Sequence, residues 1–195
     1  MVHVPHLQAK ITALLDGVEA CVFIRLAERP SVVSNRVSFP SRVSKGVSQS
    51  RDPPGALQDA LGGMRFAMTE SPDTLVLSLS ELFTEEVLIP LAAVVIDYPV
   101  AYFPAFPAQT SFLEGEPLDV YTVSFEWTSE STSSLVGEHV LLKFSCPQIL
   151  ASSHAELSPR TVIRNLHVKF AAVLERIGAS ISVTHRTETL ERVAL

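Results

Sequence analysis

The chain has 195 residues, of which 47% are hydrophobic and 18% charged, and 15 basic against 21 acidic side chains give a formal net charge of −6. This composition supports a buried core and excludes a chain that is disordered throughout, while the negative charge repels phosphate backbones and disfavours nucleic-acid binding. No signal-peptide pattern begins the chain and no apolar run reaches the roughly 18 residues of a membrane span, so we expect a soluble, cytoplasmic protein.

The first elements along the chain are a helix and a buried strand. Residues 7–15 carry leucine and isoleucine with helical spacing, and Gly17 follows as a stop. The next stretch, 19–27, is short and apolar and contains β-branched residues. It predicts a strand that enters the core directly after the turn.

Residues 28–54 break this pattern, because they are rich in serine, arginine and proline. We interpret them as a mobile basic insertion in a single domain that spans residues 1–195, and a loop of this length suggests a binding or regulatory role. The alternating phrases "RVSF" and "RVSK" leave an edge ribbon as the competing interpretation.

The middle of the chain predicts a short helix, a strand and a longer helix. The helix begins after Pro54 and is expected to stop at Gly62 and Gly63, and residues 73–80 read as a buried strand. An apolar helix over 81–96 follows, with Ser80 as its N-cap and a proline at position 90 that should kink or divide it.

Asp97 follows this apolar helix and precedes the segment "YPVAYFPAF", so it has two interpretations. It either ends the helix, with its side chain bound to local backbone N–H groups, or acts as a functional acid in a dry pocket. We favour the structural interpretation. The prolines of the segment predict a strand at the edge of a sheet, with aromatic rings that pack in the core or line a surface groove.

The second half of the chain predicts an antiparallel strand pair, a helix and a last strand. Residues 119–129 alternate polar and apolar side chains, with 138–147 as their partner strand. Residues 159–177 form an amphipathic helix between Ser158 and Gly178, and an alternating strand follows. The fold class is therefore α/β or α+β, with a single mixed sheet, a carboxy-terminal antiparallel meander and helices packed on it.

The phrases "DYPVAYFPAF", "EPLDVYTVSFEW", "LLKFSCPQIL" and "TLERVAL" resemble the carboxy-terminal half of a eukaryotic family of uncharacterised proteins. This family carries a domain of unknown function, and its human member is named only as an open reading frame on chromosome one. The resemblance implies that Tyr98, Pro99 and Val100 precede a strand pair and a long helix. It implies no reaction.

No motif marks a reactive centre or a cofactor site. The six histidines lie too far apart in sequence for a metal pattern, and the phosphate-loop, dinucleotide and nucleophile-elbow motifs are missing. We therefore expect no metal and no cofactor. Cys146 with His139 or His185 as its base is a conceivable nucleophile, but a buried, inert thiol is the favoured interpretation.

The sequence thus favours a non-enzymatic protein that binds or adapts an unknown protein partner, with no role in nucleic-acid or membrane binding. The candidate binding residues lie in the proline-broken segment and are Asp97, Tyr98, Pro99, Tyr102 and Phe103, with the 28–54 insertion as a second contact. The alternative is a small enzyme or small-molecule binder with a pocket near Asp97 that includes His139, Cys146 or His185.

Overall fold

The computed structural model describes residues 4–18, 21–26, 47–70, 84–104, 113, 115–127 and 137–189. The contacts divide the chain into two compact units, Met1–Thr110 (unit 1) and Ser111–Leu195 (unit 2). Each unit has its own three-stranded sheet. The sequence predicted a single domain that spans residues 1–195, and this stays a prediction.

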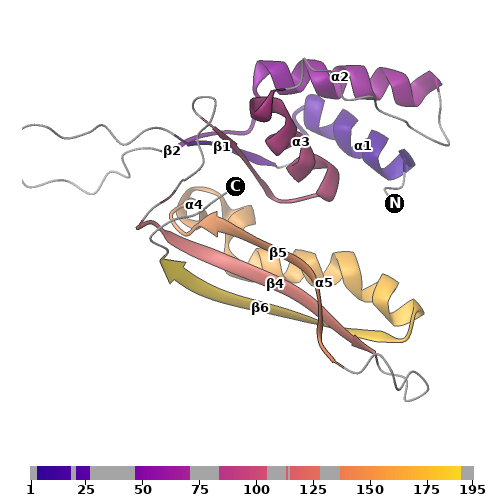
Figure 1. Cartoon of the computed structure of the whole chain (residues 1–195), viewed down its shortest axis with the longest axis vertical. Helices are drawn as coiled ribbons and strands as arrows, with labels where there is room; N and C mark the ends of the chain where they lie inside the picture. The colour runs from indigo at the N-terminus through magenta and orange to yellow at the C-terminus, as the bar shows by residue number, and fades with distance from the viewer. Residues whose placement is uncertain are drawn as a thin grey trace, which may run out of the picture. The chain divides into compact units, whose positions relative to one another are not determined.

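Unit 1 combines three helices with a mixed sheet (Figure 1). Its elements in chain order are α1 (Val4–Leu15), β1 (Val22–Leu26), β2 (Val47–Ser50), α2 (Gly55–Glu70), α3 (Glu85–Ile96) and β3 (Val100–Pro104). The strand order is β2-β1-β3, with β2 antiparallel and β3 parallel to β1. A parallel pair needs a long crossover, and α2 and α3 lie within the connection between β1 and β3.

The core of unit 1 lies between this sheet and the helices. In the central strand β1, Val22, Phe23 and Ile24 are fully covered, whereas Arg25 is exposed. The helices bury one face each, as their apolar spacing predicts. The core cluster consists of Leu7, Ile11, Leu14, Cys21, Phe23, Leu57, Ala60, Leu61, Met64, Met68, Val87, Leu91, Ala93, Val94 and Ala101. The helix predicted over 7–15 is confirmed, and the strand predicted over 19–27 is confirmed over Val22–Leu26.

The helix after Pro54 does not stop at its two glycines, so that prediction was wrong. α2 continues through Gly62 and Gly63 to Glu70. Beyond the glycines, Met64 and Met68 are buried with the same helical spacing as Leu57 and Leu61. Burial of this apolar stripe outweighs the roughly 1 kcal/mol by which each interior glycine weakens a helix.

The apolar helix α3 begins at Glu85, with Thr84 as its N-cap residue, rather than after Ser80. Pro90 lies inside the helix without dividing it, because the helix continues to Ile96. The strand predicted over residues 73–80 lies outside the described residues.

The basic insertion predicted over 28–54 is described only from residue 47. There Val47–Ser50 form strand β2, which pairs antiparallel with β1 and places Gln49 opposite Ile24, whereas the phrases "RVSF" and "RVSK" that suggested an edge ribbon lie outside the described residues. A mobile loop over the whole range was therefore wrong for Val47–Ser50. Residues 27–46 lie outside the described part of the chain.

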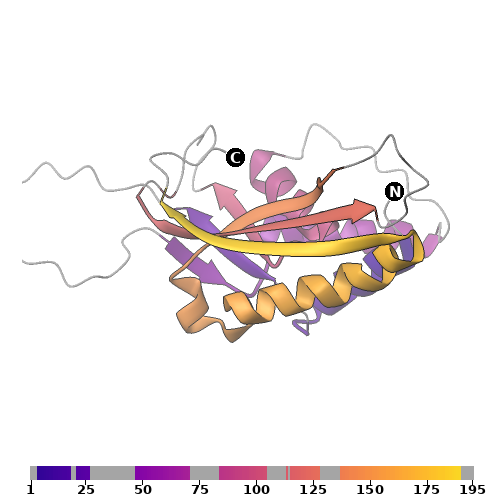
Figure 2. The same cartoon turned by 90° about the horizontal axis from the view of Figure 1, so that it is seen from below.

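Unit 2 is an antiparallel sheet with a long helix beside it (Figures 1 and 2). Its elements are β4 (Pro117–Trp127), β5 (His139–Pro147), α4 (Leu150–Ser153), a 3-10 turn η1 (Ala155–Leu157), α5 (Pro159–Arg176) and β6 (Ala179–Thr189). The order is β5-β4-β6, so the last strand returns to the free side of the first. Residue Tyr121 of β4 lies opposite Phe144 and His185.

Burial along β6 indicates that α5 covers the face of the sheet that carries Ala179, Ile181 and Val183. Ala179 is buried and Ile181 and Val183 are half-buried, whereas Ser182 and Thr184, on the opposite face, are exposed. Central strand β4 is buried on both faces, since Val120 and Ser124 are covered as well as Tyr121 and Val123. The sequence predicted one buried and one more polar face for this strand; the face with Thr122, Ser124 and Glu126 is the more polar one, and Glu126 is exposed on it.

The fold class is confirmed as α+β, with helices packed on sheets and an antiparallel carboxy-terminal sheet. The single mixed sheet is corrected to two sheets, because the meander of unit 2 pairs only within itself among the described strands. No helix in the described part of the chain is long and apolar enough to cross a membrane.

We predict that Gly63→Ala stabilises the protein by about 0.5–1 kcal/mol, because the residue is exposed within α2 and a Cβ there meets no atom within 4 Å. Gly17→Ala is the matched control, with equal space but a φ of +68°, so it should cost about 1–2 kcal/mol. Urea unfolding of both variants measures the difference. Equal effects at the two positions would contradict the assignment of a helical backbone to Gly63 and a left-handed backbone to Gly17.

Candidate functional site

Asp97 is the residue at which α3 ends and the chain turns toward β3. Its backbone is left-handed, with φ 69° and ψ 47°. The Asp97 N–H donates to the Val94 carbonyl at 3.1 Å, and the Tyr98 N–H donates to the Ala93 carbonyl at 2.9 Å. These bonds satisfy carbonyls of the last helical turn, so Asp97 is a C-cap. The predicted junction between helix and strand is confirmed.

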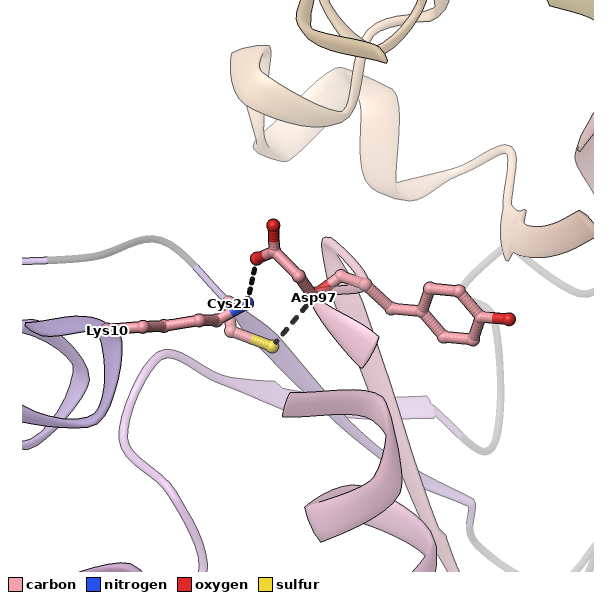
Figure 3. A network of polar contacts seen from close by, with 4 residues as sticks. Lys10, Cys21 and Asp97 are labelled. Carbon is pink, nitrogen blue, oxygen red and sulfur yellow. Dashed lines mark hydrogen bonds and ion pairs between the residues drawn. The ribbon is translucent and has the colours of Figure 1, made fainter. Parts of the chain in front are cut away.

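The side chain of Asp97 makes a contact that the sequence did not indicate. Its Oδ1 accepts from the Lys10 ammonium of α1, 87 residues earlier in the chain (Figure 3). The Lys10 side chain is 5% exposed and that of Asp97 is 31% exposed. A buried ammonium needs an anionic partner, and Asp97 supplies it. The pair therefore joins the first helix to the end of the third.

Two further contacts hold the same junction to β1. The Cys21 thiol donates to the Tyr98 carbonyl at 3.7 Å (Figure 3). The Val22 N–H donates to the Pro99 carbonyl at 3.1 Å. The register continues from there, with Val22 opposite Val100. Asp97 thus lies where α1, α3, β1 and β3 meet.

The remaining candidate residues follow Asp97 onto β3. As predicted, this strand lies at an edge of its sheet among the described strands. Tyr98 and Phe103 are partly buried and pack against the unit 1 core, which agrees with the core-packing interpretation. Tyr102 and Pro99 are half-buried. The structure brings the five residues into one short segment, and their role in binding stays a prediction.

Unit 2 contains a buried polar group that sequence reasoning missed. Asp119 is 1% exposed, and its Oδ1 lies 3.0 Å from His185 Nε2 and accepts from the Thr187 hydroxyl at 3.1 Å. A carboxylate oxygen only accepts, so the histidine contact requires a proton on Nε2. The signal was present in the sequence, because Asp119 stands on the same side of its strand as Tyr121 and Val123. Its partners on β6 were not identifiable without the strand register.

Tyr121 and Cys146 border this carboxylate on the same face of the sheet. The Tyr121 ring stacks on Phe144, with centroids 5.1 Å apart, and lies 5.0 Å from the His185 ring. Its buried hydroxyl has no hydrogen-bond partner among the described atoms. Burial, followed by the effects of Cys146 and Asp119, raises the pKa of Tyr121 above its usual range.

Cys146 lacks the features of a nucleophile. Burial, and then the Asp119 carboxylate, raises the pKa of its thiol to about 12, so the thiolate is scarce at neutral pH. His185 lies two strands away across β4, and His139 lies seven residues along β5, roughly 20 Å distant. In the described residues, no hydrogen bond joins Cys146 to an imidazole. The inert interpretation of this cysteine agrees with the structure.

His139, the third residue of the alternative site, belongs to an aromatic group at the other end of the sheet. Its ring lies 5.3 Å from that of Phe125, which meets Trp127 edge to face at 5.6 Å. His139, Cys146 and His185 are all in unit 2 and Asp97 is in unit 1. A joint pocket of these residues therefore stays a prediction.

Within the described ranges, no three His, Cys, Asp or Glu side chains gather in a way that could hold a metal ion. Comparison of the chain with family models, curated proteins and solved structures finds no match. The geometry of the two units is therefore the basis for any functional assignment.

We predict that Asp97→Ala lowers the free energy of unfolding by about 2 kcal/mol, since it removes the carboxylate that the buried Lys10 ammonium contacts. Asp97→Asn keeps a residue that tolerates the left-handed backbone and should cost less. A double-mutant cycle with Lys10→Met, measured by urea unfolding, should give a coupling of about 1 kcal/mol. Additive effects would contradict a direct interaction.

We predict that stability falls as pH rises above about 9, because the unfolded thiol of Cys146 then ionises while the folded thiol, with a pKa of about 12, keeps its proton. The Cys146 contribution is fully present below pH 8 and decreases by at most about 1.4 kcal/mol per pH unit. Unfolding free energies measured between pH 8 and 10.5 test this. Cys146→Ala should show a shallower slope, and an equal slope in both proteins would contradict the assignment.

Proposed function

We propose that this chain is a non-enzymatic, cytoplasmic partner-binding module and that the Tyr98–Phe103 segment of unit 1 is its contact site. The observation that carries the proposal is the position of this segment: it leads into β3, the edge strand among the described strands of its sheet, and exposes part of each aromatic side chain. Aromatic residues that are anchored at one side and accessible at the other are enriched at protein interfaces.

The segment is suited to contact through side chains. Pro99 precedes the strand and Pro104 is its last residue, and a proline cannot donate to an added strand, so main-chain pairing with a partner is restricted. Tyr102 lies opposite Ile24 in the register, near the middle of β3. It is half-buried and is not among the residues of the unit 1 core cluster, which makes it the best placed anchor.

The polar groups of unit 1 support binding rather than catalysis. Asp97 holds the end of α3 and contacts Lys10, so its carboxylate has a structural role. An enzyme or small-molecule site near Asp97 would need this carboxylate to turn to a ligand and leave the buried ammonium. The structural role is therefore better supported. We further propose, from the phrases around Tyr98, Pro99 and Val100, that the chain is related to the eukaryotic family described above.

We predict that Tyr102→Ser reduces recovery of specific partners about tenfold in quantitative affinity capture, because it removes a central aromatic anchor. Phe66→Ser is the matched control, since Phe66 is an exposed aromatic residue on α2. Thermal unfolding of each variant separates lost binding from lost folding. Unchanged partners for a folded Tyr102→Ser protein would contradict the proposal.

The basic insertion is tested in the same assay by deleting residues 30–45. This deletion leaves β2 in place, whereas a deletion to residue 52 would remove an edge strand of the unit 1 sheet. Loss of partners on deletion would assign part of the contact to the insertion, and unchanged partners would restrict it to the Tyr98–Phe103 segment.

A further inference from the structure

Strand β6 presents a long, regular edge in unit 2. It pairs with β4 along all 11 of its residues, without a register shift, whereas the β4–β5 pairing is irregular between Val123 and Ser124. Among the described strands, none pairs with its other side. Edge strands are usually protected by charges, prolines or bulges, but residues 179–185 of β6 contain no Lys, Arg, Asp, Glu or Pro. This edge is suited to the addition of a strand.

One side of α5 borders this edge. Ala171 and Glu175 line an open hollow of about 380 Å³ together with Gly178, Ala179, Ser180 and Ile181 at the start of β6. Arg164 and Val168 share a helical face with these two residues, because they follow the spacing i, i+4, i+7 and i+11. Val168 is 76% exposed. Ala171 and Glu175 therefore lie beside the start of the edge strand, and the helical face to which they belong carries an exposed valine between a positive charge at one end and a negative charge at the other.

A second copy of the chain matches this arrangement. Antiparallel pairing of two β6 strands about Val183 places Ser182 opposite Thr184 and Ser180 opposite Arg186, so no like charges face each other. Neighbouring strands lie about 4.8 Å apart, and a helix that covers β6 and β4 in each copy would then lie about 10 Å from its symmetry mate. This is the usual distance between packed helices.

The two-fold axis that relates the two paired β6 strands also pairs the edge-facing sides of the two α5 helices. Eleven residues of helix span about 16 Å, as do five residues of strand, so the middle of the Arg164–Glu175 face lies near the middle of β6. In an antiparallel helix pair about that point, Arg164 meets Glu175 of the second copy and Val168 meets Ala171 of the second copy. Opposite charges and a large side chain against a small one are thereby matched, and each contact occurs twice.

We propose that β6 and the Arg164–Glu175 face of α5 form a self-association surface, which joins two copies into a two-fold dimer with a continuous antiparallel sheet. This surface lies in unit 2 and is independent of the partner site proposed on β3. The sheet edge supplies main-chain hydrogen bonds, and the helix face fixes orientation through its two charges.

Sedimentation velocity of the full chain at low salt, up to about 100 µM, tests the proposal. We expect a dimer, and we expect Arg164→Glu and Glu175→Arg each to weaken it about tenfold, because attraction becomes repulsion at both symmetric contacts. The double variant Arg164→Glu/Glu175→Arg should recover wild-type association. Arg176→Glu, a charge reversal at an exposed neighbour on another side of α5, is the matched control and should have no effect.

A wild-type chain that remains monomeric at the highest concentration would overturn the proposal. It would also be overturned by a dimer that both single variants leave unchanged, since that dimer would use another surface, or by a double variant that fails to recover association. Circular dichroism of each variant confirms that it is folded. None of these outcomes depends on the partner-capture assay.

Discussion

The ion pair between Lys10 and Asp97 is the contact on which the arrangement of unit 1 depends. An ammonium that is 5% exposed is tolerated only beside an anion, and the carboxylate is presented by a residue that also ends α3 in a left-handed conformation. The pair fixes α1 against the point where the chain enters β3. Because β3 then pairs in parallel with β1, one junction positions two helices and two strands.

Unit 2 also buries a carboxylate, in a different setting. Asp119 lies in a central strand and is held by His185 and Thr187 of the neighbouring strand, whereas Asp97 lies at a helix end and is held by another helix. In both units the acid has a basic partner distant in sequence, which limits the desolvation penalty. Polar groups in the interior therefore act here to connect elements, and the pKa of Cys146 is raised by its own burial and then by the carboxylate beside it.

The edges that the described strands of the two sheets present differ in their chemistry. β3 is a short strand that follows Pro99, ends at Pro104 and presents aromatic side chains, and β6 is a long strand without charge over residues 179–185, next to a helix that carries an exposed valine and two complementary charges. The first suits side-chain contact with a different protein, and the second suits main-chain pairing with a copy of itself. A protein of this design would use one unit for recognition and the other for assembly.

The sequence by itself determined the elements with strong local signals: the helices at α1 and α5, the alternating strands β4 and β6, the edge position of β3, and Asp97 as the end of a helix. Spacing, prolines and caps act within a few residues, so they are visible in the chain. Local rules failed at Gly62 and Gly63, where burial of Met64 and Met68 continues the helix. Only the tertiary structure decided that there are two sheets, that Lys10 meets Asp97 and that His185 meets Asp119. These contacts join residues 66 to 87 positions apart, and which of many possible partners they select depends on strand order and helix packing rather than on neighbouring residues.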